Sequence, residues 1–294
     1  MDDNTAFSGF PLQGVIGVIA NGPDEILLAS ERKLQCVEIR ADLLLDNGHT
    51  PDDIYTLIKQ TKKQGIACLF TLRHPDHGGT FKGSESARVS INRKALESGA
   101  DLVDAEWNTE AALQLLAEDA PLILSYHDFS AMPDAQSLQA LTDSMSAMQP
   151  RAIKVVPTAE TLADTIRMLM WVENAQDNVS RIGFAMGGAG ECSRILTLAF
   201  GAPVTYATFG KPVAPGQIDI DLLLTQFRAP QLNADTAVVA VTGSEGFCEN
   251  KLKTLNEQFE KLSENRVAIA FETEWLESTK ALHDELRIVE VVTE

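Results

Sequence analysis

The chain has 294 residues, 45% of them hydrophobic, and its 24 basic against 42 acidic side chains give a formal charge of −18, which argues against nucleic-acid and anionic-membrane partners. No apolar run approaches the roughly 20 residues that span a bilayer, and the start Met-Asp-Asp-Asn lacks the basic and apolar parts of a signal peptide. We therefore expect a soluble, cytoplasmic protein.

Short apolar runs alternate with helical patterns from residue 14 onward, which predicts parallel strands joined by right-handed crossovers. Eight such runs favour an α/β fold, a (β/α)8 TIM barrel over residues 1–228. An open doubly wound sheet would have fewer strands, and no GxGxxG follows the first run. The predicted strands are Gly14–Ala20, Cys36–Leu44, Cys68–Arg73, Leu102–Trp107, Leu122–Asp128, Ala152–Pro157, Arg181–Met186 and Pro203–Phe209, and the predicted helices include Pro51–Gln64, Ser84–Glu97, Thr158–Glu173 and Glu191–Phe200.

Charged and polar side chains share one face of five successive predicted strands. Because side chains alternate along a strand, the apolar positions of each would pack on helices while the polar positions point into the barrel. A barrel interior is normally filled by branched apolar side chains, so this constellation predicts an active site. The inward residues are Glu38, Arg40, Asp42, Thr71, Arg73, Asp104, Glu106, Ser125, His127 and Lys154.

Lys154 lies in the middle of the short apolar run Ala152–Pro157. A buried ammonium must be paired or neutralised, and a lysine with a lowered pKa is a nucleophile that forms a Schiff base with a ketone. The alternative is an edge-strand lysine that reaches solvent. The polar residues on the neighbouring strands favour the nucleophile.

The later loops supply candidate ligand-binding groups. Gly187-Gly188-Ala189-Gly190 precedes a predicted helix and could present backbone N–H groups to an anion, a weakly specific signal. Arg194 on that helix would pair with a carboxylate, and Gly210–Gln217 has the composition of a lid. The cysteines Cys36, Cys68, Cys192 and Cys248 are far apart and predict neither a disulfide nor a metal site.

Seven short motifs, in order, resemble the type I 3-dehydroquinate dehydratases of the shikimate pathway. The resemblance implies dehydration of 3-dehydroquinate to 3-dehydroshikimate without metal or cofactor. Lys154 matches the family's Schiff-base lysine, and His127 matches its general acid/base. The motifs are Val37–Asp42, Phe70–Arg73 with Gly78-Gly79, Val103–Glu106, Ser125–Phe129, Ile153–Val155, Met186–Arg194 and Ala214–Gln217.

The resemblance also implies roles for residues around the substrate. Side chains that match the family's ligands for substrate hydroxyls are Glu38, Arg40, Arg73 and Gln217, while Arg194 matches the ligand of the carboxylate. Met186 and Tyr206 match positions that wall the pocket.

Three positions depart from the family pattern. His77 stands where the family has a glutamate partner for the catalytic histidine, and it is either a loop residue or a substitute proton relay. Val213 replaces a lid serine or threonine, which removes a hydrogen bond worth about 1 kcal/mol. Tyr206 replaces phenylalanine, a mild change if the hydroxyl finds a partner.

Residues 229–294 restart the pattern as a small βαβαβ unit. Thr236–Thr242, Arg266–Phe271 and Arg287–Val292 are predicted strands, and Asn250–Leu262 and Trp275–Glu285 are predicted helices. The segment resembles the start of a shikimate dehydrogenase substrate domain, truncated before the catalytic lysine motif and the nicotinamide domain, so we expect no dehydrogenase activity. Its exposed strand edges suggest docking or dimer formation, and we predict a homodimer.

Two other functions compete with the dehydratase. One is a class I aldolase-type or phosphate-binding barrel lyase that uses the same lysine, against which Arg194 and the Glu38–Arg40 pair argue. The other is a catalytically impaired barrel that serves as a scaffold or sensor, favoured only by His77 and Val213. Biosynthetic and quinate-degrading roles stay open, because both use this step.

Overall fold

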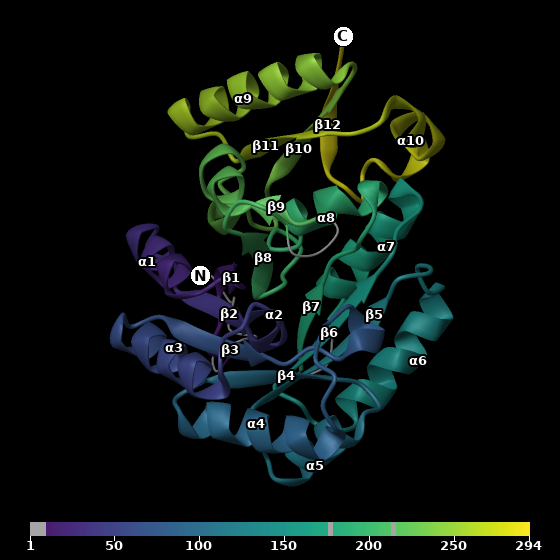
Figure 1. Cartoon of the computed structure of the whole chain (residues 1–294). Helices are drawn as coiled ribbons and strands as arrows, with labels where there is room; N and C mark the ends of the chain where they lie inside the picture. The colour runs from purple at the N-terminus through teal and green to yellow at the C-terminus, as the bar shows by residue number, and fades with distance from the viewer. Residues whose placement is uncertain (1–9, 176–178, 213–215) are drawn as a thin grey trace, which may run out of the picture.

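The computed structural model describes residues 10–175, 179–212 and 216–294, and it places a curled parallel sheet inside a layer of helices (Figure 1). The strands are β1 (Gly14–Ile19), β2 (Cys36–Arg40), β3 (Ala67–Thr71), β4 (Leu102–Glu106), β5 (Leu122–Asp128), β6 (Ala152–Pro157), β7 (Ser180–Gly183), β8 (Val204–Thr208) and β9 (Ile218–Asp219). Their order is β7-β6-β5-β4-β3-β2-β1-β8-β9, so β1 joins the first and last parts of the chain. No ladder between β7 and β8 occurs among the described residues. The predicted α/β barrel fold is confirmed.

The covering helices begin at recognisable capping residues. Thr50 and Thr161 each accept a hydrogen bond from the backbone N–H of the third residue of the helix, and the carboxylates of Asp53 and Asp164 accept one from the backbone N–H of the capping residue. The barrel helices are α1 (Pro23–Glu31), α2 (Ala41–Asp46), α3 (Pro51–Lys63), α4 (Glu85–Glu97), α5 (Glu110–Ala117), α6 (Ala135–Ser146), α7 (Leu162–Glu173) and α8 (Glu191–Leu196). Within the part of the chain that the structure describes, no helix combines the length and apolar character needed to cross a membrane.

Side-chain alternation along the strands separates two apolar cores, of which only the outer one is predicted from the sequence. Outward residues such as Val37, Ile39 and Phe70 pack with the helices. Inward residues such as Cys36 and Leu69 fill one end of the barrel, in a smaller cluster that also includes apolar side chains at the other end. The polar inward residues occupy the other end. The apolar plug therefore closes the barrel below the charged constellation.

The predicted strand Cys36–Leu44 is wrong beyond Arg40, where the chain turns directly into α2. Asp42 therefore lies on a helix, where it is buried and accepts two hydrogen bonds from Arg40 at 2.9 and 2.8 Å. A helix also puts Ala41 and Leu44 on its buried side, so the apolar pattern fits both structures.

Three predicted helices are shorter than expected. The helix predicted over Thr158–Glu173 begins only at Leu162. The predicted helix Glu191–Phe200 ends at Leu196, and the helix predicted over Trp275–Glu285 is divided into α10 (Thr273–Ser278) and the short 3₁₀ helix Lys280–Leu282. Cys36, Cys68 and Cys192 are buried, whereas Cys248 is half-buried.

The C-terminal residues form a separate three-stranded parallel sheet beside the barrel, next to α8 (Figure 1). Its elements are β10 (Ala237–Thr242), α9 (Glu245–Lys261), β11 (Arg266–Ala270), α10 and β12 (Ile288–Thr293), in the sheet order β11-β10-β12. The predicted βαβαβ unit is confirmed. Arg287 connects the two parts, because it pairs with Glu173 at 2.5 Å and lies over the ring of Phe200. The domain division at residue 228 stays a prediction.

Candidate active site

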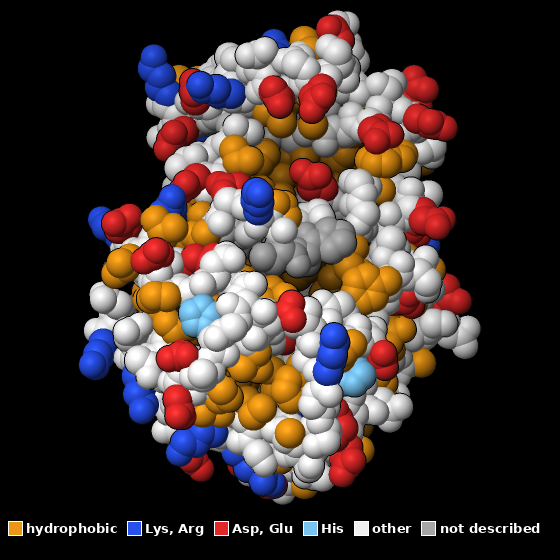
Figure 2. Space-filling model, viewed as in Figure 1, with side chains coloured by type: hydrophobic (Ala, Val, Ile, Leu, Met, Phe, Trp, Pro, Cys, Tyr) orange, Lys and Arg blue, Asp and Glu red, His pale blue; other side chains and the backbone are white. Residues whose placement is uncertain are grey.

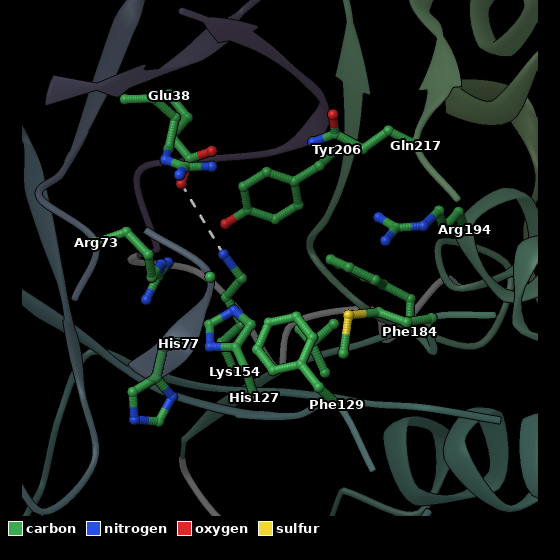
Figure 3. Close-up of a pocket in the computed structure, with 14 residues that line it drawn as sticks. Glu38, Arg73, His77, His127, Phe129, Lys154, Phe184, Arg194, Tyr206 and Gln217 are labelled. Atoms are coloured by element: carbon green, nitrogen blue, oxygen red, sulfur yellow. Dashed lines mark ion pairs between the residues drawn. The ribbon is translucent and has the colours of Figure 1, made fainter. Parts of the chain in front are cut away.

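A pocket of about 120 Å³ opens at the polar end of the barrel and is the candidate site (Figure 3). All ten residues predicted for the site line it, although they come from elements between β2 and β9. The lining residues are Glu38, Arg40, Arg73, His77, Gly78, His127, Phe129, Lys154, Val156, Phe184, Met186, Arg194, Tyr206 and Gln217.

Lys154 projects from β6 into the pocket and is only 4% exposed. Its Nζ lies 3.3 Å from Asp104 Oδ2, 4.0 Å from Glu38 Oε1 and 4.1 Å from the centre of the Tyr206 ring. Burial lowers the pKa of this ammonium below its ordinary value, although the two carboxylates oppose the shift. The amine form is therefore easier to reach than for a lysine in water.

Arg73 organises the anionic side of the pocket. Its Nη1 donates to Asp104 Oδ1 at 2.8 Å, Glu106 Oε1 at 3.0 Å and Ser125 Oγ at 2.8 Å. Burial alone would raise the pKa of Asp104, but Arg73 and Lys154 hold it well below its usual range. Asp104 therefore remains a carboxylate beside Lys154.

Glu38 and Arg40 are fixed by neighbours on β3 and α2. Thr71 donates to Glu38 Oε1 at 2.7 Å. Arg40 makes a two-bond contact with Asp42, which also accepts from the backbone N–H of Thr80. This support presents both side chains to the pocket in fixed positions.

His127 and His77 meet edge to face, with ring centres 5.9 Å apart. Burial lowers the pKa of His127 well below its ordinary value, and the charges of Arg73 and Lys154 add to the effect. Burial also lowers the pKa of His77. Among the described residues, Nδ1 of each ring has no hydrogen-bond partner. His127 is thus a neutral imidazole beside another imidazole rather than beside a carboxylate.

Arg194 brings a cation to the pocket from α8. The side chain is buried, and its guanidinium carbon lies 4.4 Å from the centre of the Phe184 ring. Burial lowers the pKa of Arg194 to about 10, so it stays cationic at neutral pH. The glycine-rich segment Gly187–Gly190, whose backbone N–H groups were predicted to bind an anion, does not line this pocket with Arg194. Gly188 and Ala189 line another cavity instead.

Four lining residues were missed by sequence reasoning: Gly78, Phe129, Val156 and Phe184. Phe184 lies two residues before Met186, so alternation could have found it. Phe129 is 49% exposed and packs against Gly78, where an added Cβ would lie 2.8 Å from the ring. Gly78 also has φ 77°, so both its conformation and this contact require glycine. Val213 lies outside the described residues.

A larger cavity, of about 540 Å³, lies between α9 and the barrel. Its lining includes Glu191, Glu245, Glu249 and Glu272, and no lysine or arginine from the described part of the chain. Figure 2 shows apolar and acidic side chains together in this region. Such a cavity repels an anion and offers no amine nucleophile, so the smaller pocket is the better candidate for the predicted chemistry.

Arg88 lies outside the pocket and stabilises it through Glu106, which leads to a prediction about stability. This fully buried side chain of α4 pairs with Glu106, the carboxylate that also binds Arg73. We expect Arg88→Met to lower the free energy of unfolding by about 3–5 kcal/mol, because it leaves a buried carboxylate short of a partner. Urea unfolding of the variant measures this loss.

The matched control for Arg88 is Arg93→Met on the same helix. Arg93 pairs with Glu118, but both side chains are largely exposed. Water replaces such a pair readily, so the control should unfold nearly as the wild type does. Equal losses in the two variants would contradict the assigned importance of the buried pair.

Comparison with known proteins places most of the chain in one group. The sequence profile of the family described as Type I 3-dehydroquinase matches residues 20–234. A 3-dehydroquinate dehydratase from Dehalococcoides mccartyi is 32% identical over 217 residues, which are 72% of this chain and 93% of that protein.

The chain is also similar to proteins that combine two enzyme activities. The bifunctional 3-dehydroquinate dehydratase/shikimate dehydrogenase of Arabidopsis thaliana is 32% identical over 237 residues, covering 77% of this chain but only 38% of that protein. The structure of the S. pombe dehydroquinate dehydratase and shikimate dehydrogenase matches 98% of this chain and 57% of its own, with a TM-score of 0.61 and 20% identity. These matches agree with the resemblance noted for residues 229–294.

Proposed function

Because the chain belongs to the type I 3-dehydroquinase family and is a 3-dehydroquinate dehydratase, we propose that it acts through a Schiff base on Lys154, with His127 as general acid/base. The observation that carries this proposal is the buried Lys154 ammonium, with a lowered pKa, in the same pocket as a neutral histidine. A lysine of this kind attacks a ketone, whereas a solvated lysine stays protonated.

The carbon–nitrogen chemistry begins when the Nζ lone pair of Lys154 attacks the substrate ketone. Loss of the ketone oxygen as water gives an iminium, which acidifies the adjacent C–H. Asp104, held as a carboxylate 3.3 Å from Nζ, stabilises the positive nitrogen.

His127 then moves the proton in the elimination step. As a neutral imidazole it removes the acidified proton, and the resulting enamine expels the β-hydroxyl, which takes a proton from the imidazolium. Hydrolysis of the iminium releases the enone product and restores Lys154. Burial of His127 supports this role, because it keeps the base unprotonated at neutral pH.

The remaining pocket residues fit the binding of a polyhydroxylated carboxylate. We assign the substrate carboxylate to Arg194 and the hydroxyls to Glu38, Arg40, Arg73 and Gln217. Arginine suits the carboxylate because its fork donates two parallel hydrogen bonds. Met186 and Tyr206 wall the pocket, with Phe184 beside them.

Borohydride trapping tests the mechanism directly. The protein is incubated with 3-dehydroquinate and borohydride, its intact mass is measured, and the labelled peptide is mapped. We expect a reduced adduct on Lys154, with enone absorbance growing in a parallel sample without borohydride. Absence of both adduct and enone would overturn the proposal. An adduct without enone would favour the catalytically impaired barrel. Retro-aldol products from another ketone would favour a lyase.

His77 gives a prediction about pH. In the wild type the pKa of His127 is lowered, so activity should persist below the pH at which an ordinary histidine becomes protonated. Replacing His77 by glutamate adds a negative charge beside the ring, stabilises the imidazolium and raises the His127 pKa. The acidic limb of the kcat–pH profile should therefore move to higher pH in His77→Glu.

The neutral variant His77→Gln is the control for this experiment. It removes the second imidazole without adding charge, so its acidic limb should stay nearer to that of the wild type. A limb that moves to lower pH in His77→Glu would contradict the assignment of His127 as the base.

The function of residues 229–294 stays a prediction. We infer a docking or dimer-forming role for them, because β12 is an edge strand on which Val289 and Val291 are exposed. The homodimer and the cytoplasmic location also stay predictions.

A further inference from the structure

The Tyr206 hydroxyl is an unusual polar group in the pocket. Tyr206 lies on β8 and is 2% exposed, yet its Oη has no hydrogen-bond partner among the described residues. Buried hydroxyls are nearly always paired, and one that is not costs stability. A group retained at such a cost at a site needs an explanation beyond packing.

The position of the hydroxyl indicates what it serves. Lys154 Nζ lies 4.1 Å from the centre of the Tyr206 ring, and Figure 3 shows the hydroxyl directed toward the Lys154–Glu38 ion pair. Burial raises the Tyr206 pKa well above its ordinary value, and the charges of Glu38 and Asp104 add to the shift. The phenol is therefore a neutral donor and does not give up its proton.

We propose that Tyr206 Oη donates a hydrogen bond to the oxygen of the ketone that Lys154 attacks, an inference that rests on the Schiff-base mechanism above. As the C–N bond forms, the C=O π pair moves to that oxygen. A proton passes from nitrogen to the oxygen to give a carbinolamine. That hydroxyl takes a second proton from solvent, equal to the one that the Lys154 ammonium releases before attack, so the C–O bond breaks and water leaves as the iminium forms. Tyr206 keeps its own proton throughout.

Neither the two carboxylates near Lys154 nor His127 is suited to donate to this oxygen. Glu38 and Asp104 are carboxylates that already accept from Thr71 and from Arg73, so they offer no proton to an oxygen. His127 is needed for the adjacent C–H. A donor beside the attacked carbonyl stabilises the developing negative charge on oxygen, as an oxyanion hole does.

The Tyr206→Phe variant separates this role from a structural one by two readouts with opposite signs. We expect two rates to fall about tenfold: the single-turnover rate at which the borohydride-trapped adduct forms, and kcat/KM. A tenfold fall corresponds to the loss of one hydrogen bond from a neutral donor. We expect the melting temperature to rise by about 2 °C, because the variant no longer buries an unpaired hydroxyl. KM should change less than kcat.

Tyr126→Phe is the matched control. The Tyr126 hydroxyl lies outside the pocket and donates to Asp128 Oδ2 at 3.2 Å. This variant loses a made hydrogen bond, so its melting temperature should not rise and its adduct rate should match the wild type.

Each outcome decides the question. Slower adduct formation together with a higher melting temperature supports the proposal. Unchanged adduct formation in Tyr206→Phe overturns it, and so does a slower rate that comes with a lower melting temperature, because the hydroxyl would then be structural. Absence of both adduct and enone in the wild type would instead overturn the Schiff-base mechanism itself.

Discussion

Lys154→Met should remove the borohydride-trapped adduct and lower kcat by on the order of 10⁴-fold or more, the scale seen when a covalent nucleophile is removed. Methionine matches the length of the lysine stem and is compatible with burial, so the change deletes the amine and little else. Intact-mass analysis after borohydride treatment, together with enone absorbance, measures both effects.

The loss should not come from unfolding, and the structure says why. Asp104, the nearest partner of Lys154, keeps hydrogen bonds from Arg73 and Ser125 in the variant. The ammonium is also a buried charge whose pKa is lowered by that burial, so its removal relieves a desolvation cost. Urea unfolding should therefore find Lys154→Met about as stable as the wild type.

Lys154→Arg is the second half of this experiment. Arginine keeps the positive charge beside Asp104 but cannot deprotonate to attack a ketone. Lys154→Arg should therefore be as inactive as Lys154→Met, although it keeps the positive charge that Lys154→Met loses. Substantial turnover by either variant would show that Lys154 is not the nucleophile.

The sequence predicted the strands and the inward face of the barrel because both follow from period-two alternation. A slip of one residue would have turned Glu38 and Lys154 toward the helices, and the apolar neighbours Val37 and Val155 rule that out. The predicted site residues that lie on this inward face therefore meet in one pocket.

Local pattern could not decide where a strand ends. Ala41 to Leu44 fits a strand and a helix equally, and the structure places these residues in α2 because Asp42 then reaches Arg40 and Thr80. The choice depends on contacts with a residue 38 positions away. Tertiary contacts of this kind leave no trace in local periodicity.

The sequence also could not predict which side chains contact one another. His77 and His127 are 50 residues apart, and only the fold shows that their rings meet edge to face. The sequence could note that Tyr206 needs a hydroxyl partner, but only the structure shows that its hydroxyl lacks one among the described residues. Phe129 and Gly78 were missed for the same reason.

His127→Ala is expected to separate adduct formation from turnover. The imidazole moves protons in the elimination, and loss of a positioned general acid/base costs about 10²- to 10⁴-fold in rate. Lys154 remains in place, so borohydride should still trap a covalent adduct on it while enone absorbance grows slowly. The acidic limb that we assign to His127 should also disappear from the kcat–pH profile.

His49→Ala controls for the loss of a histidine elsewhere in the chain. His49 is half-buried, outside the pocket, and contacts the backbone oxygen of Asn21 at 3.2 Å. This variant should turn over at the wild-type rate. If His127→Ala also turned over at that rate, another group would have to move the protons, and His77, whose pKa is likewise lowered by burial, would be the next residue to replace. If instead His127→Ala failed to form any adduct, His127 would be required before elimination, for attack by Lys154 or loss of the ketone oxygen.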